Sequence, residues 1–305
     1  MEIEQGYKQM SRVMKVDAAL LVFTAIWGLS FPLTKNILEY TSIFSFLSLR
    51  FLSAAIILLI VFYKKLRRIT LNSILYGSII GLVFFGSLAF QVSSLRFTSA
   101  SNSAFISGLS IVFVPLLSAK LQGKKPDISS VLGVITAAIG LFFISGGLTF
   151  KFNLGDFLAL MCAVCITFQI IFIDMFSSKC DPSLIGIFQV SFCAIFYTLI
   201  SFFTDSRPLH INTELILSIF VTGILGTALA YTGLAFLHRF TSPTHTAIIF
   251  SAEPVFATIF AVIIPNSKGL GEVLSLNTVI GCVMILCAML ISELKICKPG
   301  ADSAM

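Results

Sequence analysis

The chain has 305 residues, of which 57% are hydrophobic and 11% charged, and a formal net charge of +6. Long apolar runs alternate with short polar loops, which excludes an ordinary soluble protein and indicates a polytopic membrane protein. The positive charge does not indicate a nucleic-acid partner, because the cations gather in loops on one side of the predicted spans.

The apolar runs predict ten membrane-spanning helices, each close to the roughly 20 residues that a bilayer requires. In chain order the expected spans are Val16–Asn36, Ile43–Tyr63, Leu71–Ser93, Ser101–Leu121, Ile128–Leu148, Gly155–Phe176, Leu184–Phe203, Glu214–Phe236, Pro243–Ile264 and Val273–Ser292. The sequence therefore predicts an all-α integral membrane protein, in which 1–16 and 293–305 are polar end segments.

The loops predict the orientation of the chain. Of the 20 Lys and Arg residues, 14 lie in loops on the side of the N-terminus, so the positive-inside rule predicts that both termini are cytoplasmic. The first apolar segment follows three cations, as a signal peptide would. It has full span length and no small-residue cleavage pattern, so we expect a span in the cytoplasmic (inner) membrane.

The sequence predicts no cofactor, metal site or disulfide framework. None of the seven cysteines falls in an outer loop, and Cys162 and Cys165 lie inside an apolar span, where small packing residues are the simpler interpretation. The three histidines fall in separate loops or span ends, and no phosphate-binding glycine loop occurs. An enzyme or an ATP-driven pump is therefore not indicated.

The first two spans contain candidate site residues. Pro32 interrupts the hydrogen bonds of the first span, and Ser30 is a small donor that can satisfy a freed carbonyl. Trp27 lies well inside this span, where it either packs between helices or forms the wall of a cavity. In the second span, Arg50 either extends outward or pairs with an anionic ligand group or a buried carboxylate.

Further polar groups lie at membrane depth in later spans, and Pro115 predicts a break in the fourth. Neutral hydrogen-bonding groups of this kind either join helices or contact a solute. As a set, several of them are expected to contact a solute. The group comprises Gln91, Asn102, Gln169, Gln189 and Tyr231.

The ninth span carries the strongest signal, because Glu253 lies near its middle and Pro254 follows directly. A carboxylate at this depth costs about 2.5 kcal/mol or more to insert, and the proline predicts a bend or opening of the helix. Glu253 is either a structural hydrogen-bonding group or a group that carries a proton or holds a cationic solute. His245, two turns earlier, is either an interfacial polar group or a proton relay.

The chain contains an internal repeat. Arg-Phe-Thr-Ser begins at Arg96 and again at Arg239, an offset of 143 residues, and each copy leads into a helix that contains proline. We therefore expect two five-span repeats, 17–150 and 151–292. Because five crossings are an odd number, the second repeat runs opposite to the first, an architecture typical of secondary transporters with a solute site between the halves.

These features resemble the EamA-type branch of the drug/metabolite transporter superfamily. The matching stretches are Trp27-Gly-Leu-Ser-Phe with Lys35, Arg50-Phe, Phe97-Thr-Ser-Ala through Pro115-Leu-Leu, Gly155-Asp-Phe-Leu-Ala, Ser242-Pro-Thr through Glu253-Pro-Val-Phe-Ala, and Ile280-Gly with Leu290-Ile. The family's Gly-Glu after the fourth span reads Gly123-Lys124-Lys125 here, whereas Gly271-Glu272 is present in the second half. The resemblance implies a central cavity lined chiefly by spans one, three, four, six, eight and nine, so Gln189 on span seven is not expected to contact solute. It also implies export or exchange of small metabolites.

The predicted function is secondary transport of a small polar or zwitterionic metabolite, such as an amino acid, by alternating access. The neutral polar groups favour such a solute over a phosphate, for which paired cations would be expected. Protons are a candidate coupling ion. The alternatives are uptake of a nucleoside-type metabolite such as S-adenosylmethionine, and a membrane scaffold without transport.

Overall fold

The structure is a computed structural model that describes residues 2–121, 128–144, 152–177, 179–205, 211–237, 249–266 and 269–293. These residues are almost entirely helical, and no strand occurs among them. In chain order the helices are α1 (Glu2–Ile37), α2 (Ile43–Val61), η1 (Lys65–Arg68), α3 (Leu71–Ser94), α4 (Ala100–Ser107), α5 (Ser110–Leu121), α6 (Ile128–Ile144), α7 (Leu154–Ser177), α8 (Pro182–Thr204), α9 (Thr213–Ile219), the π-helix η3 (Phe220–Leu229), α10 (Ala230–Leu237), α12 (Glu253–Ile263) and α13 (Leu276–Glu293).

Length and apolarity allow six helical segments to cross a membrane. They are Met14–Ile37, Ile43–Val61, Leu71–Ser94, Ala100–Leu121, Leu154–Ser177 and Pro182–Thr204, each matching a predicted span to within a few residues. Four shorter apolar segments lie in the regions of the remaining predicted spans: Val131–Ile144, Thr213–Leu229, Glu253–Ile263 and Leu276–Ile291. The all-helical membrane fold is thereby confirmed.

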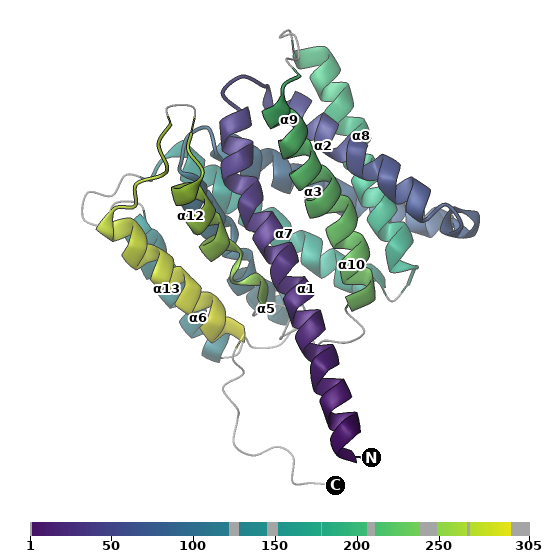
Figure 1. Cartoon of the computed structure of the whole chain (residues 1–305), viewed down its shortest axis with the longest axis horizontal. Helices are drawn as coiled ribbons and strands as arrows, with labels where there is room; N and C mark the ends of the chain where they lie inside the picture. Colours follow the sequence, from purple (N-terminus) through teal and green to yellow (C-terminus); the bar gives the residue numbers. More distant parts are fainter. Residues whose placement is uncertain are drawn as a thin grey trace.

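The helices form one bundle in which α1 and α12 pack together near the middle (Figure 1). On one side α6 packs along α13, and on the other α2 and α3 both pack against α8. Buried apolar side chains form one cluster centred on α2, α3 and α8, and a second that includes α6 and α13. The chain enters α1 and leaves α13 at the same end of the bundle (Figure 1).

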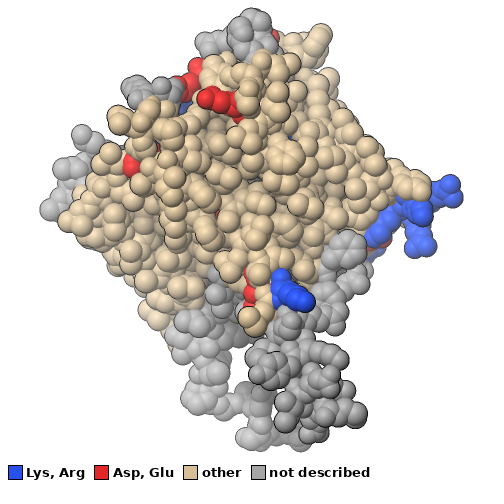
Figure 2. Space-filling view, in the orientation of Figure 1, with Lys and Arg blue, Asp and Glu red and all other residues tan. Residues whose placement is uncertain are grey.

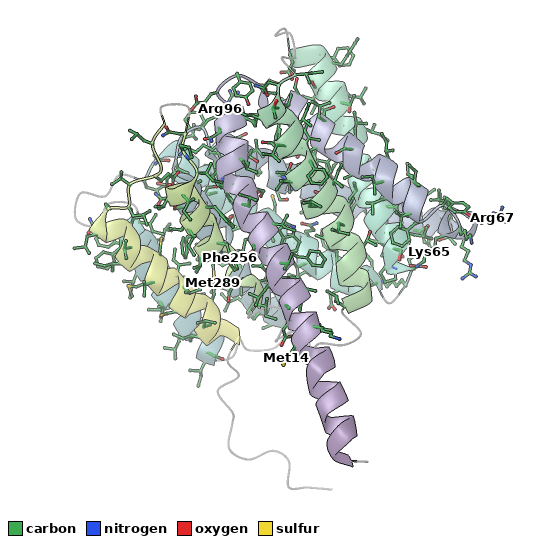
Figure 3. All side chains as sticks on the ribbon, in the orientation of Figure 1. Met14, Lys65, Arg67, Arg96, Phe256 and Met289 are labelled. Carbon is green, nitrogen blue, oxygen red and sulfur yellow. The ribbon has the colours of Figure 1, made fainter. Side chains whose placement is uncertain are left out.

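Charged side chains lie mainly at the edges of the bundle. Uncharged residues dominate the middle of the face seen in Figure 2, as expected for a surface in contact with lipid. Arg96 lies at the opposite end of the molecule from Met14, and Lys65 and Arg67 lie at a lateral extremity (Figure 3). The segment η1 holds Lys65, Arg67 and Arg68 and has no buried residue.

Two helix breaks lie at equivalent positions of the sequence repeat. A turn at Gly108 and Leu109 separates α4 from α5, and a turn at Ser251 and Ala252 precedes α12. The two turns are separated by 143 residues, the offset of the Arg-Phe-Thr-Ser repeat. They also lie close together, because a Cβ atom added to Gly108 would be 3.2 Å from Cγ of Pro254.

Of the three prolines expected to break helices, only Pro254 lies next to one of these turns. Pro254 lies in the first turn of α12, a position where the missing N–H of proline costs no helical hydrogen bond. Pro115 lies inside α5, and the expected break there is wrong: the chain turns earlier, where Leu109 N–H donates to the Ile106 carbonyl (3.1 Å). Pro32 lies inside a continuous α1.

The contact between α6 and α13 depends on two facing glycines. A Cβ atom added to Gly281 would lie 2.6 Å from the carbonyl oxygen of Gly140, and one added to Gly140 would lie 3.0 Å from the carbonyl oxygen of Gly281. Each glycine thus allows the other helix's backbone to approach, as in the small-residue contacts of membrane helices.

Gly281→Ala should lower the stability of the purified protein by about 1–3 kcal/mol, because the added methyl group overlaps backbone atoms that cannot rotate away. Thermal unfolding in detergent measures the effect. Gly186→Ala on α8 is the matched control, because a Cβ atom there meets nothing within 4 Å. Equal melting temperatures for the two variants would contradict the close approach.

Candidate functional site

A cavity of about 250 Å³ lies beside the two helix breaks. It is lined from α1, α3, both sides of the α4–α5 break, α7 and the start of α12. The lining residues are Trp27, Gln91, Ala104, Ser107, Gly108, Ser110, Ile111, Ile166, Gln169, Ile170, Ile173, Phe250, Glu253 and Pro254. Ligand pockets commonly occupy about 300–1,000 Å³. This cavity is slightly smaller, so it suits a small metabolite.

Glu253 is the acidic residue of this lining. It occupies the first turn of α12, where the positive end of the helix dipole stabilises a carboxylate. Among the described residues, no side chain hydrogen-bonds to it, but the positive charge of Arg50 acts on it. Cys162 on α7 is also within electrostatic range. The helix break thus presents a carboxylate to the cavity.

Trp27 both packs between helices and forms a wall of the cavity, so the two interpretations of its position hold together. Its indole N–H donates to the carbonyl oxygen of Gly226, 2.6 Å away in η3. In a π-helix the backbone hydrogen bonds span five residues instead of four. The hydroxyl of Thr227 likewise donates to the carbonyl five residues earlier, at Thr222 (2.8 Å). The indole ring also meets Phe250 edge to face, with centroids 5.0 Å apart.

Two of the predicted glutamines line the cavity. Gln91 lies on α3, and Gln169 lies on α7 and donates from Nε2 to Oε1 of Gln189 on α8 (3.3 Å). Gln189 was the glutamine expected to join helices rather than contact solute, and it makes this interhelical bond. The hydroxyl of Ser107, which the sequence did not single out, lines the cavity and donates to the Ala104 carbonyl (3.1 Å).

The structure does not bring every candidate to the cavity wall. Ser30 donates to the Trp27 carbonyl (2.6 Å) within α1. Arg50 is buried, with 7% of its surface exposed, and it is not among the lining residues. Asn102 lies in α4 and is not among the lining residues, and its buried Oδ1 has no hydrogen-bond partner among the described residues. His245 and the side chain of Tyr231 lie outside the described residues.

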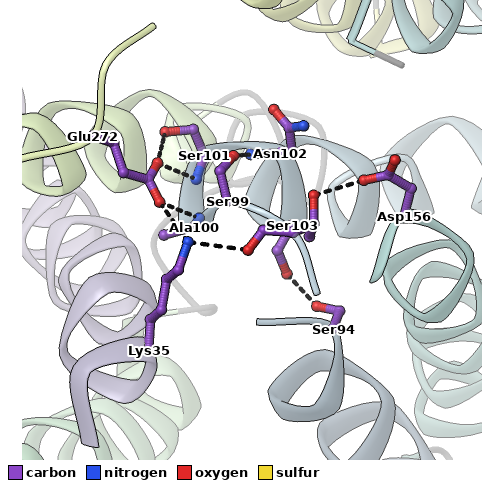
Figure 4. A network of polar contacts seen from close by, with 10 residues as sticks. Lys35, Ser94, Ser99, Ala100, Ser101, Asn102, Ser103, Asp156 and Glu272 are labelled. Atoms are coloured by element: carbon purple, nitrogen blue, oxygen red, sulfur yellow. Dashed lines mark hydrogen bonds and ion pairs between the residues drawn. The ribbon is translucent and has the colours of Figure 1, made fainter. Parts of the chain in front are cut away.

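A second polar site, which we call the Glu272 cluster, joins Glu272 to Lys35, Ala100 and Ser101 (Figure 4), and through Lys35 to the Thr98 carbonyl. Glu272 Oε1 accepts from Lys35 Nζ (3.0 Å) and from Ala100 N–H (2.6 Å). Its Oε2 accepts from the N–H (3.3 Å) and hydroxyl (2.9 Å) of Ser101, while Lys35 also donates to the Thr98 carbonyl (3.0 Å). The carboxylate therefore caps the N-terminus of α4 and ties α1 and α4 to the segment between α12 and α13.

Sequence reasoning noted Gly271-Glu272 as a family feature but did not predict this cluster. The available signal was a carboxylate in a loop together with Ser99, which caps α4 by accepting from Asn102 N–H (2.9 Å). Since Lys35 and Glu272 are separated by 237 residues, their pairing follows from tertiary structure. An adjacent bond from Thr98 to Asp156 (2.7 Å) joins the same region to α7 (Figure 4).

The Glu272 cluster should make stability depend on pH. Burial raises the pKa of Glu272, but the charge of Lys35 and the hydrogen bonds from Ala100, Lys35 and Ser101 outweigh it and hold the pKa below its ordinary value. A lowered pKa in the folded state stabilises the protein above the unfolded-state pKa of about 4.3, and this stabilisation is lost as pH falls through the folded-state value.

In thermal melts, the stability difference between wild type and Glu272→Gln is therefore expected to be full near neutral pH. It should shrink as the pH falls below about 4. A difference that stays constant throughout that range would show that the carboxylate's charge does not stabilise the cluster.

Comparison with known proteins identifies the family. The model of the EamA-like transporter family matches the chain twice, over residues 14–146 and 153–293. An uncharacterized transporter of Archaeoglobus fulgidus is 30% identical over 96% of this chain and 90% of its own length. The uncharacterized transporter YyaM of Bacillus subtilis is 25% identical, over 91% of this chain and 93% of its own length.

A solved crystal structure shares the fold, with a TM-score of 0.61 and 18% identity over 92% of this chain and 96% of that one. The family and these relatives indicate a membrane transporter rather than an enzyme. The chain belongs to the EamA-like transporter family.

Proposed function

We propose that the chain is a secondary transporter that exports or exchanges a small polar or zwitterionic metabolite by alternating access. The observation that supports this proposal is the cavity beside two helix breaks, which lie 143 residues apart at equivalent positions of the sequence repeat. Broken helices in corresponding positions of two repeats are where such transporters bind solute. Trp27, Gln91, Gln169 and Glu253 are the proposed solute contacts, and Glu253 is the proposed proton-exchanging group.

The proposed architecture is two repeats, 17–150 and 151–292, inserted in opposite senses. The two separate family matches support this division. The helix packing supports it as well, because contacts between the halves come in equivalent pairs. The packing of α3 on α7 has its counterpart in α1 on η3, and that of α1 on α12 has its counterpart in α7 on α4 and α5. The reciprocal glycines of α6 and α13 are a further such contact.

In the proposed orientation the protein lies in the cytoplasmic membrane, and both of its termini lie in the cytoplasm. The Glu272 cluster then lies at the external end, as do Asp205 and the Ser42, Ser45 and Ser201 hydroxyls that donate to it. Beyond the other ends of α2 and α8, Lys65 pairs with Asp181 (3.1 Å). The polar contacts between the halves at the external end suggest a conformation closed on that side, in which the cavity communicates with the cytoplasm.

Flux through proteoliposomes tests the function. Vesicles loaded with a radiolabelled mixture of amino acids and their decarboxylated amines should release at least one compound faster than protein-free vesicles, and should exchange it against unlabelled compound outside. Product formation without flux would indicate an enzyme, and neither flux nor exchange would indicate a scaffold. Flux only from outside to inside, in vesicles of known orientation, would favour uptake over export.

A further inference from the structure

The polar groups of the cavity are unequally divided between donors and acceptors. Three lining residues already use a donor within the protein: Trp27 on the Gly226 carbonyl, Ser107 on the Ala104 carbonyl and Gln169 on Gln189. Ser107 and Gln169 keep acceptor oxygens, and Gln169 keeps one further N–H. The indole of Trp27 has no second N–H to donate and accepts no hydrogen bond.

The cavity lining also carries more negative than positive charge. Glu253 is a carboxylate, and no Lys or Arg occurs among the described residues that line the cavity. Arg50 acts on Glu253 from α2, and it is not among the described residues that line the cavity. Gln91 and Ser110 retain neutral donors. They can bind a neutral polar group but cannot balance the charge of a solute carboxylate.

The rest of the wall fits an apolar or aromatic body. Trp27 and Phe250 form an edge-to-face aromatic corner beside Glu253, and isoleucines of α5 and α7 continue the wall. An ammonium group supplies three donors and no acceptor, and it is attracted both by a carboxylate and by aromatic faces.

We infer that the cavity selects small primary amines, which carry an ammonium group on an apolar or aromatic body, over zwitterions and carboxylates of the same size. This inference rests on the proposed function and narrows its solute class. Loss of the solute carboxylate removes a charged group that the described lining cannot satisfy, while the ammonium group finds the acceptors that the wall provides.

Trp27 makes the inference measurable, because it is the only tryptophan of the chain and lies in the cavity wall. Its fluorescence in purified protein is titrated with 2-phenylethylamine, L-phenylalanine and 3-phenylpropionate, which share a phenyl body and differ in charge. The amine should bind about tenfold or more tightly than the zwitterion, and the carboxylate should bind most weakly.

Two variants locate the source of the preference. Glu253→Gln should bring the affinities for the amine and the zwitterion to within about threefold, which corresponds to less than 1 kcal/mol. Asp174→Asn is the matched control, because Asp174 is an exposed carboxylate on α7 outside the cavity lining, and it should retain the wild-type ranking. The wild-type ranking alone tests the inference if the Glu253 variant does not fold.

Binding of the zwitterion or carboxylate as tightly as the amine, or binding of none of the probes, would overturn the inference. These outcomes differ from a failure of the proposed function. Exchange of L-phenylalanine but not 2-phenylethylamine in proteoliposomes would reject the amine preference and leave the transporter intact. A cavity that never becomes accessible from either side of the membrane would reject alternating access itself.

Discussion

Replacing Glu253 with glutamine is expected to lower solute flux on the order of 10- to 100-fold and to abolish its dependence on pH. Glutamine preserves the size of the side chain and one acceptor oxygen, but it carries neither a negative charge nor a proton to exchange. A hydrogen bond to a charged group contributes about 1.5–3 kcal/mol, and that loss sets the size of the expected effect. Exchange in proteoliposomes between pH 5.5 and 8.5 measures both quantities.

Asp174→Asn is the appropriate control here too, because it removes a carboxylate from α7 without altering the cavity lining. Wild-type flux with an unchanged pH profile in the Glu253→Gln variant would mean that the carboxylate is a structural group at the start of α12. A reduced flux with the pH profile retained would assign Glu253 to solute binding and place the proton on another residue.

Disrupting the Glu272 cluster is expected to open the end of the bundle where it lies. Glu272→Leu removes the carboxylate that accepts from Lys35, Ala100 and Ser101, so the closed conformation should lose about 2–4 kcal/mol relative to the open one. Glu272→Gln keeps an oxygen for the backbone N–H groups and should have a smaller effect. Distances between spin labels on the α3–α4 and α12–α13 loops would report the opening.

A charge swap separates this cluster from a simple ion pair. Lys35→Glu combined with Glu272→Lys preserves opposite charges but leaves the N–H groups of Ala100 and Ser101 facing an ammonium group, which accepts no hydrogen bond. The double variant should therefore remain as open as Glu272→Leu. Restoration of the wild-type distances by the swap would show that attraction between two charges is sufficient.

The sequence was most informative where a single helix determines the result. The predicted spans correspond to helices because a membrane helix satisfies its own backbone hydrogen bonds, and apolar run length alone reveals that requirement. The same local reasoning placed Trp27, Gln91, Gln169 and Glu253 at membrane depth, and all four line the cavity. A polar group at such depth requires protein or water beside it.

Features that depend on packing between helices were harder to predict. The first break was assigned to Pro115, whereas the chain turns at Gly108, beside Pro254. Sequence alone does not reveal that neighbour. Likewise, the position of Asn102 at membrane depth did not show which side of α4 faces the cavity. The Glu272 cluster depends on a contact between the first helix and a loop near the end of the chain.

The unusual helices of the second half share one physical basis. The Gly226 carbonyl of the π-helix η3 accepts from the Trp27 indole, and the turn before α12 presents Glu253. Backbone that departs from regular α-helix at membrane depth needs protein or water to satisfy its polar groups. In this bundle such irregular backbone lies beside the cavity, where a rearrangement of the two halves would change its surroundings.

Accessibility of the cavity from each side of the membrane tests the central claim most directly. A single cysteine replacing Ser107, in a background without the native cysteines, is exposed to a membrane-impermeant maleimide applied to either face of oriented vesicles. With the Glu272 cluster intact, labelling should occur mainly from the cytoplasmic face, and Glu272→Leu should add labelling from the external face. Labelling from one face alone in both backgrounds would contradict alternating access through this cavity.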